Sequence, residues 1–445
     1  MAFWEILLTL IFFLLPNQLG RHFWFNFSHL FGIKIDYLAP TVFLQDLLIL
    51  LLIITKKDNL LLFLKKRKNF FFLFLFSSLN ILFSLCPWVS LFAWLKIFEF
   101  LFFAIIISQN KQKAFKIFLR TLPLLVFFEF FLSLFQMVKG SSLNGFFWYF
   151  GERKFNLLTP GIAKGDFFGR LFLRPYGTFS HPNSLAGFFL VVFCFLATNI
   201  KSLNFLGKIS LPFCFLLIFF SFSQIAWLCL GFVILAIFFK KFFLKLFSFK
   251  KLIFPIFVLI SLFPLLLNKK FPQINSIEER SFLLQSSFKL ISCYPLLGVG
   301  LNNFIIGLAK QESFLGKKYL LQPVHNLFFL VISEIGILGF LLLFFLVRKN
   351  FKNKLPRSKP ALSADRLTRY SGTSPEEFVS LSHSSVQQAG RYSASRNKKP
   401  SLTFLSNHSL EISLFIVFFT GAFDHYWLTL IQNQLLFFLL IGFCL

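Results

Sequence analysis

Runs of apolar residues alternate with short polar segments along almost the whole chain. Each run is bounded by Lys, Arg, Pro or Gly and contains few charges, which is typical of helices that cross a lipid bilayer. The pattern predicts an all-α, polytopic membrane protein with about twelve membrane-spanning helices. The expected spans lie near residues 3–15, 41–55, 70–85, 89–108, 115–138, 183–200, 207–222, 224–239, 252–267, 326–347, 410–424 and 427–445.

Three longer segments interrupt these spans. Residues 139–182 and 268–325 are too long to be simple connections, and long loops of this kind usually carry function. Residues 348–409 are rich in Ser, Arg, Lys and Pro, so we expect a disordered cytoplasmic insertion that acts as a solvated linker rather than as a partner-binding segment. This insertion would separate a main bundle, residues 1–347, from two last spans in residues 410–445.

The composition supports a membrane protein. Of the 445 residues, 57% are hydrophobic and 14% are charged, and the mean hydropathy is +0.75, which is too apolar for a soluble core. The net charge of +28 would indicate a nucleic-acid partner in a soluble protein, but here the basic residues cluster between apolar runs. The six cysteines are scattered without a C-x-x-C pair, so neither a disulfide framework nor a zinc site is expected.

The clusters of Lys and Arg predict the orientation. They lie at 56–68, 111–120, 201–208 and 240–251, and again after Val347. Because basic loops stay in the cytoplasm, both termini are expected there, and segments 139–182 and 268–325 are expected outside. The first apolar run lacks a basic leader and a cleavage site, so we expect it to stay as an uncleaved span.

The first outer segment ends in a group of residues suited to binding an anion. Arg170, Arg174 and His181 converge just before an apolar run, and Pro182 suits the first turn of a helix. A helix start beside guanidinium groups can hold a phosphate, and a lipid-linked phosphate is available at that depth. Alternatively, the arginines only anchor the loop to lipid headgroups.

The second outer segment supplies further candidates. It contains Arg280 after two glutamates, and it ends where His325 and Asn326 open the tenth span. A histidine at the outer mouth of a span can act as a general base, although it can also be a plain interfacial residue. Glu334 follows about two turns into the membrane, where an acid is usually paired.

Other residues near the outer side add to these candidates. Asp424 and His425 lie in the outer turn before the last span and could face the same cavity. Gly336 and Gly339, spaced G-x-x-G, would let another helix pack closely.

Together these segments resemble the O-antigen ligase and O-antigen polymerase family of bacterial membrane glycosyltransferases. The resemblance rests on R-P-Y-G-T-F-S-H-P-N-S-L-A-G at 174–187, P-L-L-G-V-G-L-N-N-F at 295–304, and His325-Asn326 followed by nine residues and Gly336-x-x-Gly339. The last is the most specific. Segments 18–24 and 36–41 also resemble members of this group, so the resemblance covers most of the chain except the insertion.

The resemblance implies a GT-C-like fold with a periplasm-facing cavity and a role in lipopolysaccharide or other cell-envelope polysaccharide biosynthesis. The enzyme would move a glycan from an undecaprenyl diphosphate carrier to a hydroxyl of a glycan, lipid or protein acceptor, in the bacterial inner membrane. It would use no nucleotide sugar, cofactor or metal. Carried over by motif, His325 is the catalytic base. Arg174 and Arg280 clamp the diphosphate, assisted by Arg170, His181 and Asn326.

Two departures from the family pattern keep alternatives open. Gln224 stands where the family usually has Arg, and Phe340 follows Gly339 where ligases prefer a small or hydroxylated residue. A repeat-unit polymerase is therefore an alternative to a ligase. Two non-enzymatic alternatives are a polysaccharide or lipid transporter and a scaffold that recruits partners through residues 348–409.

Overall fold

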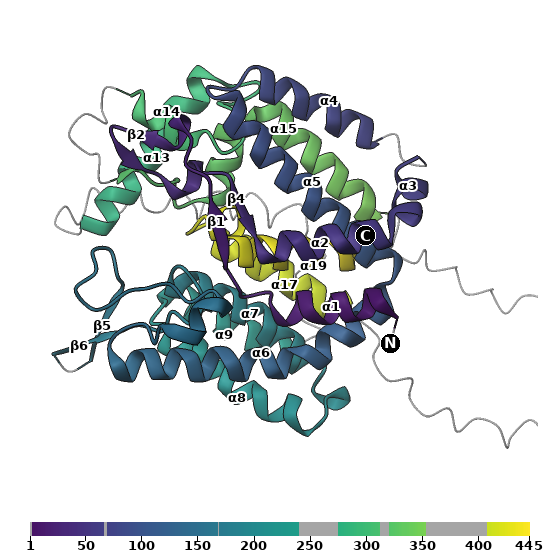
Figure 1. Cartoon of the computed structure of the whole chain (residues 1–445), viewed down its shortest axis with the longest axis vertical. Coiled ribbons are helices and arrows are strands. Elements are labelled where there is room, and N and C mark those ends of the chain that lie inside the picture. Colours follow the sequence, from purple (N-terminus) through teal and green to yellow (C-terminus); the bar gives the residue numbers. More distant parts are fainter. Residues whose placement is uncertain (1, 66–68, 168, 240–274, 312–319, 353–406) are drawn as a thin grey trace, which may run out of the picture.

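The protein is a bundle of helices whose axes run side by side in the computed structural model (Figure 1). The structure describes residues 2–65, 69–167, 169–239, 275–311, 320–352 and 407–445. Each expected span within these residues contains a helix, whereas the expected span 252–267 lies outside them. These helices are α1 (Phe3–Phe13), α2 (Leu44–Thr55), α4 (Asn69–Leu82), α5 (Pro87–Gln109), α6 (Lys111–Lys139), α7 (Pro182–Thr198), α8 (Phe205–Phe220), α9 (Gln224–Phe238), α15 (Leu327–Lys352), α17 (Asn407–Gly421) and α19 (Ile431–Cys444).

Two of the described helices, α5 and α6, are long and apolar enough to cross a membrane by themselves. Most of the others are apolar but shorter, and α3 (Lys57–Lys65) is a short basic-ended helix between α2 and α4. The expected number of twelve spans is therefore not confirmed. Helices α15 and α17 extend a few residues into the predicted insertion, and residues 353–406 lie outside the described part of the chain.

Local sequence explains where the main helices begin and end. Pro87 and Pro182 occupy the first turns of α5 and α7, where the missing N–H costs nothing because it would have no partner within the helix. The expected helix start at Pro182 is thus confirmed. Helix α6 ends at Gly140, whose φ of 70° is the left-handed conformation that glycine adopts without strain.

Large aromatic side chains fill the centre of the bundle. Phe12, Phe118, Phe195 and Phe443 come from α1, α6, α7 and α19 and are fully buried in one cluster. Other apolar side chains face outwards, among them Phe71 of α4, which is 65% exposed. A water-soluble protein would pay a large penalty for such a surface, whereas lipid solvates it.

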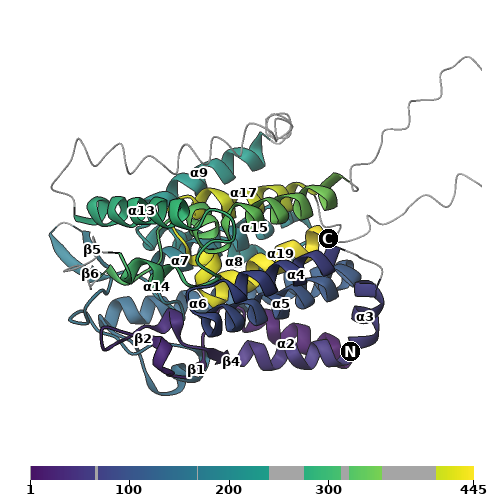
Figure 2. The ribbon, with the colours of Figure 1, turned by 90° about the horizontal axis from the view of Figure 1, so that it is seen from above.

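One end of the bundle carries small sheets and short helices, and both chain termini lie at the opposite end (Figures 1 and 2). Three antiparallel pairs form there: β1 (Gly20–His22) with β4 (Thr41–Phe43), β2 (His29–Leu30) with β3 (Ile33–Lys34), and β5 (Lys164–Phe167) with β6 (Arg170–Leu173). Helices α13 (Asn275–Cys293) and α14 (Phe304–Ala309) lie at the same end. The all-α prediction therefore holds for the bundle but misses these hairpins.

Helix α15 is interrupted at Gly336, whose φ is 63°. The loop that begins at Pro295 crosses this break, and its carbonyls accept hydrogen bonds from the amides of Ile337 and Leu338. A side chain on Gly336 would overlap the Leu296 carbonyl. The G-x-x-G pair therefore has two uses: Gly339 packs against Phe76 of helix α4 as expected, whereas Gly336 admits a loop backbone instead of a helix.

Candidate functional site

Two histidines and an aspartate meet at the end of the bundle that carries the hairpins. His325 precedes α15, while Asp424 and His425 precede the short helix α18 (Tyr426–Thr429). The Nδ1 atom of His325 lies 3.4 Å from Oδ1 of Asp424, and their side chains are 21% and 14% exposed. The rings of His325 and His425 are 5.1 Å apart between centroids. The three residues form one cluster that is partly open to solvent, called the histidine cluster below.

Asn326 holds the two sides of this cluster together. Its side-chain oxygen accepts hydrogen bonds from the amides of Phe328 and Phe329, which caps the start of α15. Its amide nitrogen donates to the Ala422 carbonyl at 3.0 Å. Asn326 is 2% exposed. These contacts tie His325 to the segment before Asp424 and bury the Asn326 side chain, and its expected role in diphosphate binding stays a prediction.

Arg174 is linked to the same cluster through the side-chain amide of Asn183. Its Nε donates to the Ser221 carbonyl at 2.6 Å, and its Nη2 donates to Oδ1 of Asn183 at 2.9 Å. The Asn183 amide nitrogen in turn lies 3.4 Å from Oδ2 of Asp424. Burial lowers the pKa of the Arg174 guanidinium from its ordinary value, and Tyr176 acts in the opposite direction.

The turn that follows Arg174 is fixed by two buried side chains of α6. The carboxylate of Glu129 accepts hydrogen bonds from the backbone and hydroxyl of Thr178, and the Gln136 amide exchanges two bonds with the backbone of Gly177. Gly177 has a φ of 56°, and a Cβ there would overlap the Glu129 carboxylate. The Y-G-T part of the motif therefore sets where Arg174 and His181 stand.

Arg280 approaches from helix α13. Its Nη1 donates to the Phe423 carbonyl at 2.9 Å, one residue before Asp424. Its positive charge also acts on Asp424, His181 and His425. Arg280 thus contacts residue 423 directly, whereas Arg174, from a different segment, is linked to Asp424 through Asn183.

The other two residues expected near the diphosphate have different positions. His181 caps α7, and its Nδ1 accepts a hydrogen bond from the Asn183 amide at 3.1 Å. Burial lowers the pKa of His181 to about 4, so it is neutral at pH 7 and does not attract an anion by charge. Arg170 begins strand β6 opposite Phe167, and its side chain lies outside the described part.

The charges of the histidine cluster support one another. Burial alone would raise the pKa of Asp424, but the hydrogen bond and charge of His325, with further contributions from His425 and Arg280, hold it well below its usual range. Burial lowers the pKa of His425 to about 3, against the opposing charge of Asp424. At neutral pH the site therefore contains a carboxylate and a neutral His425, whose Nδ1 lies 2.7 Å from the Thr429 hydroxyl.

The donor atoms of His325, Asp424 and His425 lie within 4.8 Å of one another. Two imidazoles and a carboxylate can hold a divalent metal such as zinc. In this protein, however, Nδ1 of His325 faces Asp424 and Nδ1 of His425 faces Thr429, while the charge of Arg280 disfavours a nearby cation. The arrangement favours an ion-paired cluster over a cation site.

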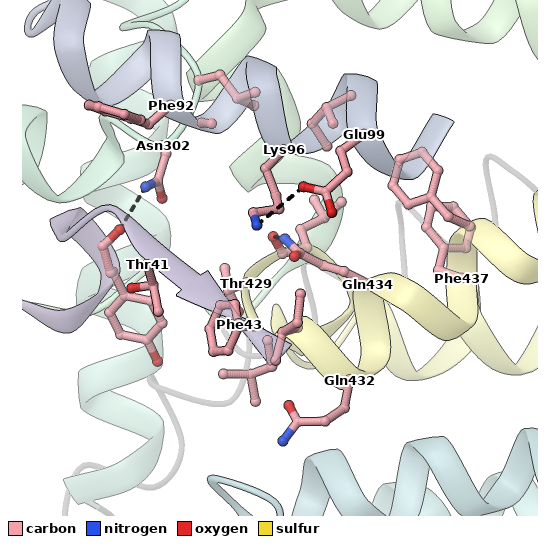
Figure 3. A pocket seen from close by; sticks show the side chains of 18 of the residues that line it. Thr41, Phe43, Phe92, Lys96, Glu99, Asn302, Thr429, Gln432, Gln434 and Phe437 are labelled. Atoms are coloured by element: carbon pink, nitrogen blue, oxygen red, sulfur yellow. Dashed lines mark hydrogen bonds and ion pairs between the residues drawn. The ribbon is translucent and has the colours of Figure 1, made fainter. Parts of the chain in front are cut away.

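A cavity of about 1720 Å³ lies beside the histidine cluster. It is lined mainly by apolar side chains of the bundle, and it also exposes Lys96 and Glu99 of α5, which face Gln434 of α19 in Figure 3. Lys96 is ion-paired with Asp46 of α2 and lies 3.4 Å from Glu99. The cavity reaches the cluster through two lining residues that contact His425: Thr429, by a hydrogen bond, and Tyr37, ring edge to face at 5.9 Å.

The fold and this site define a helical membrane protein with a histidine and arginine cluster at one end of its bundle. Residues 209–344 match the family model described as O-antigen ligase. This part of the chain is thus similar to the O-antigen ligase family, whose members are membrane-embedded, glycosyltransferase-like enzymes. The match includes Arg280 and His325 and leaves out Arg174 and Asp424. No curated protein matches the chain.

Sequence reasoning assigned no role to three features of the site. Asn183 lay inside a motif, but only its contact with both Arg174 and Asp424 shows what it links. Asp46 lies in the expected span 41–55, and only the packing of α2 on α5 reveals its ion pair with Lys96. Gln224, which stands where the family usually has Arg, begins α9. Three residues before it, the Ser221 carbonyl accepts a hydrogen bond from Arg174.

Proposed function

We propose that this protein transfers a glycan from an undecaprenyl diphosphate carrier to an acceptor hydroxyl, on the outer side of the bacterial inner membrane. The observation that carries the proposal is that His325 and Arg280 contact residues 423–424 directly, while Arg174 reaches Asp424 through Asn183. A general base beside two fixed guanidinium groups suits a reaction in which a hydroxyl attacks and a diphosphate leaves.

Each of these residues has its own role in the proposed reaction. The acceptor oxygen forms a bond to the anomeric carbon while the bond from that carbon to the diphosphate oxygen breaks, and the electron pair leaves with the diphosphate. His325 takes the proton from the acceptor hydroxyl, and Asp424 stabilises the resulting imidazolium. Arg174 and Arg280 bind the diphosphate more strongly as its charge grows, so they lower the barrier rather than only the KM.

The position of the site supports its assignment to the outer side. Both termini lie at the end of the bundle opposite to the histidine cluster (Figure 1). The basic clusters at 56–65 and 111–120 belong to the connection between α2 and α4 and to the start of α6, as expected for cytoplasmic segments. With the termini in the cytoplasm, the histidine cluster opens towards the periplasm.

The proposal is tested by deleting the gene and restoring it with variants. His325→Ala and Arg174→Ala are expected to abolish surface polysaccharide while the protein still inserts into the membrane. Arg174→Lys is expected to lower the rate of transfer by more than about tenfold, because an ammonium cannot reproduce the forked contacts to Ser221 and Asn183. Lys164→Ala is the matched control, since this exposed cation lies on β5 at the same end of the molecule. Normal polysaccharide in both alanine variants would exclude the catalytic role.

The same strains distinguish a ligase from a polymerase. Loss of a ligase leaves long polymer attached to the undecaprenyl carrier, whereas loss of a polymerase leaves single repeat units there. We expect long carrier-linked polymer to accumulate in the deletion strain, as the match to the O-antigen ligase model favours. Unchanged carrier-linked glycan in the deletion strain would instead favour a protein without transferase activity.

A further inference from the structure

Two basic residues stand at the edge of the large cavity without a partner. Arg153 and Lys154 both line the cavity and are exposed. Among the described residues, neither one forms a hydrogen bond or an ion pair. The nearest acid in the sequence, Glu152, is 3% exposed and accepts hydrogen bonds from the Leu143 amide, the Asn144 amide and Gln136. It is therefore not available to neutralise them.

The backbone that carries the two cations is held in place. Gly151 has a φ of 93°, and a Cβ there would lie 2.5 Å from the Gln18 amide nitrogen. The residue after Gly151, Glu152, is fixed to the end of α6 by Gln136 and to the turn after α6 by the Leu143 amide. Arg153 and Lys154 are thus presented from a positioned loop, which lowers the entropy lost when a group binds to them.

The charge of Arg153 reaches both sides of the histidine cluster. Burial raises the pKa of Tyr37 to about 12, an effect that Asp424 increases and Arg153 opposes. Burial likewise raises the pKa of Tyr176, where both Arg174 and Arg153 act in the opposite direction. Tyr37 contacts His425 and Tyr176 lies two residues after Arg174, so the charge of Arg153 acts on two residues that flank the site.

Two amide side chains of the same cavity have unsatisfied polar atoms. Gln432 (Figure 3) is 1% exposed, and its Oε1 has no hydrogen-bond partner among the described residues. The Nε2 of Gln18 is buried and also lacks a partner within the described chain. Buried groups of this kind are costly unless a ligand completes them. One donor and one acceptor in the same cavity as two cations suit a polar, hydroxyl-bearing anion.

We propose that Arg153 and Lys154 form a second anion-binding subsite at the mouth of the cavity, which takes a carboxylate or phosphate carried by a glycan substrate. This group is distinct from the diphosphate that leaves at Arg174 and Arg280. The inference rests on the proposed function and adds to it that at least one substrate is an acidic glycan. Asp36 also lines the cavity, and its carboxylate acts against the attraction of Arg153 and Lys154 for an anion.

The experiment compares matched charged and neutral substrates. The full-length protein in detergent is given two undecaprenyl diphosphate donors that differ only in a glucuronate or a glucose residue, and two acceptors that differ in the same way. Arg153→Gln combined with Lys154→Gln is compared with Lys164→Gln, which removes an exposed cation from β5. We expect the double variant to raise KM for a charged substrate about tenfold and to leave kcat and the neutral substrates unchanged.

The outcomes identify the source of the anion. A KM effect with the glucuronate donor assigns the acid to the transferred glycan, and an effect with the glucuronate acceptor assigns it to the acceptor. Transfer that responds to His325→Ala but shows neither effect overturns the subsite and leaves the proposed function standing.

If the wild-type protein transfers none of these probes, a binding measurement tests the subsite. A glucuronate-containing disaccharide should then bind the wild-type protein about tenfold more tightly than the double variant at low salt, and equally at 1 M salt, where charges are screened beyond about 3 Å. Equal binding at low salt, or an effect of the double variant only on retention of phosphatidylglycerol, overturns the proposal.

Discussion

The imidazole of His325 lies 3.4 Å from the carboxylate of Asp424, although 99 residues separate them in the chain. The contact orients the ring, because a hydrogen bond to one imidazole nitrogen decides which nitrogen is free to accept a proton. Asp424 also receives the Asn183 amide and lies beside the Phe423 carbonyl that Arg280 contacts. Asp424 thus contacts the proposed base directly, is linked to Arg174 through Asn183, and adjoins the residue that Arg280 contacts.

Asp424→Asn is expected to lower kcat by about 10²-fold, because an amide neither stabilises the imidazolium nor holds its tautomer. The loss should be smaller than that of His325→Ala, since the base remains. Initial rates of glycan transfer measure both. Asp166→Asn is the control: this acid lies on the β5 hairpin at the same end of the molecule and is exposed. Equal rates for Asp424→Asn and the wild-type protein would contradict the role of the pair.

The helical bundle could be predicted from the sequence because apolar runs are a local signal. Helices such as α5 and α7 begin where Pro87 and Pro182 indicate. The sequence also points to Arg174, Arg280 and His325; the fold brings His325 and Arg280 to residues 423–424 and links Arg174 to them through Asn183. This link was not predictable, because Asn183 contacts Asp424 only once α7 and the segment after α17 have packed together.

The hairpins and the helix break were missed for a related reason. The strands are short and their sequences lack sustained alternation, so only pairing across the chain reveals them. Helix α13 is too polar to resemble a membrane span, so the sequence predicts a loop there. The cavity beside Lys96 and Glu99 likewise depends on how several segments, α5 and α19 among them, pack together, which no single segment encodes.

Stability is expected to fall when the solution is acidified, because His425 is buried as a neutral ring. Its pKa is about 3 in the fold and about 6.5 in an unfolded chain. Between these values the unfolded state binds a proton that the folded state does not. The contribution is thus complete above about pH 6.5 and declines as the pH falls towards 3, by about 1.4 kcal/mol per pH unit.

Thermal unfolding of the detergent-solubilised protein between pH 7 and pH 4 measures this effect. His425→Asn should flatten the pH dependence, even if the variant is less stable overall at pH 7. His22→Asn is the control, since that side chain is exposed on β1. A slope unchanged by His425→Asn would show that other groups cause the acid sensitivity.

Removal of divalent metals is expected to leave activity intact. His325, Asp424 and His425 could compose a metal site by residue type, but the Nδ1 atoms of the two histidines are engaged with Asp424 and Thr429, and Arg280 adds an unfavourable charge. Transfer assays after extensive dialysis against EDTA, with and without added Zn²⁺ or Mg²⁺, measure this. Loss of activity on chelation and recovery with one metal would reassign the cluster as a metal centre.

Gly336→Ala is expected to destabilise the protein and reduce activity together, because it acts on the frame that holds His325. The residue has a φ of 63°, and a Cβ would overlap the Leu296 carbonyl. The added methyl must either push away the loop after Pro295, which bonds to Ile337 and Leu338, or close the break in α15. Strain of this kind costs about 1–3 kcal/mol.

Gly231→Ala in α9 is the matched control, since a Cβ there meets nothing within 4 Å, and alanine favours a helix by about 1 kcal/mol over glycine. Unfolding midpoints in detergent should therefore fall for Gly336→Ala and stay level or rise for Gly231→Ala. If the two variants were equally stable, the crossing of the loop through α15 would not be a strong constraint on the site.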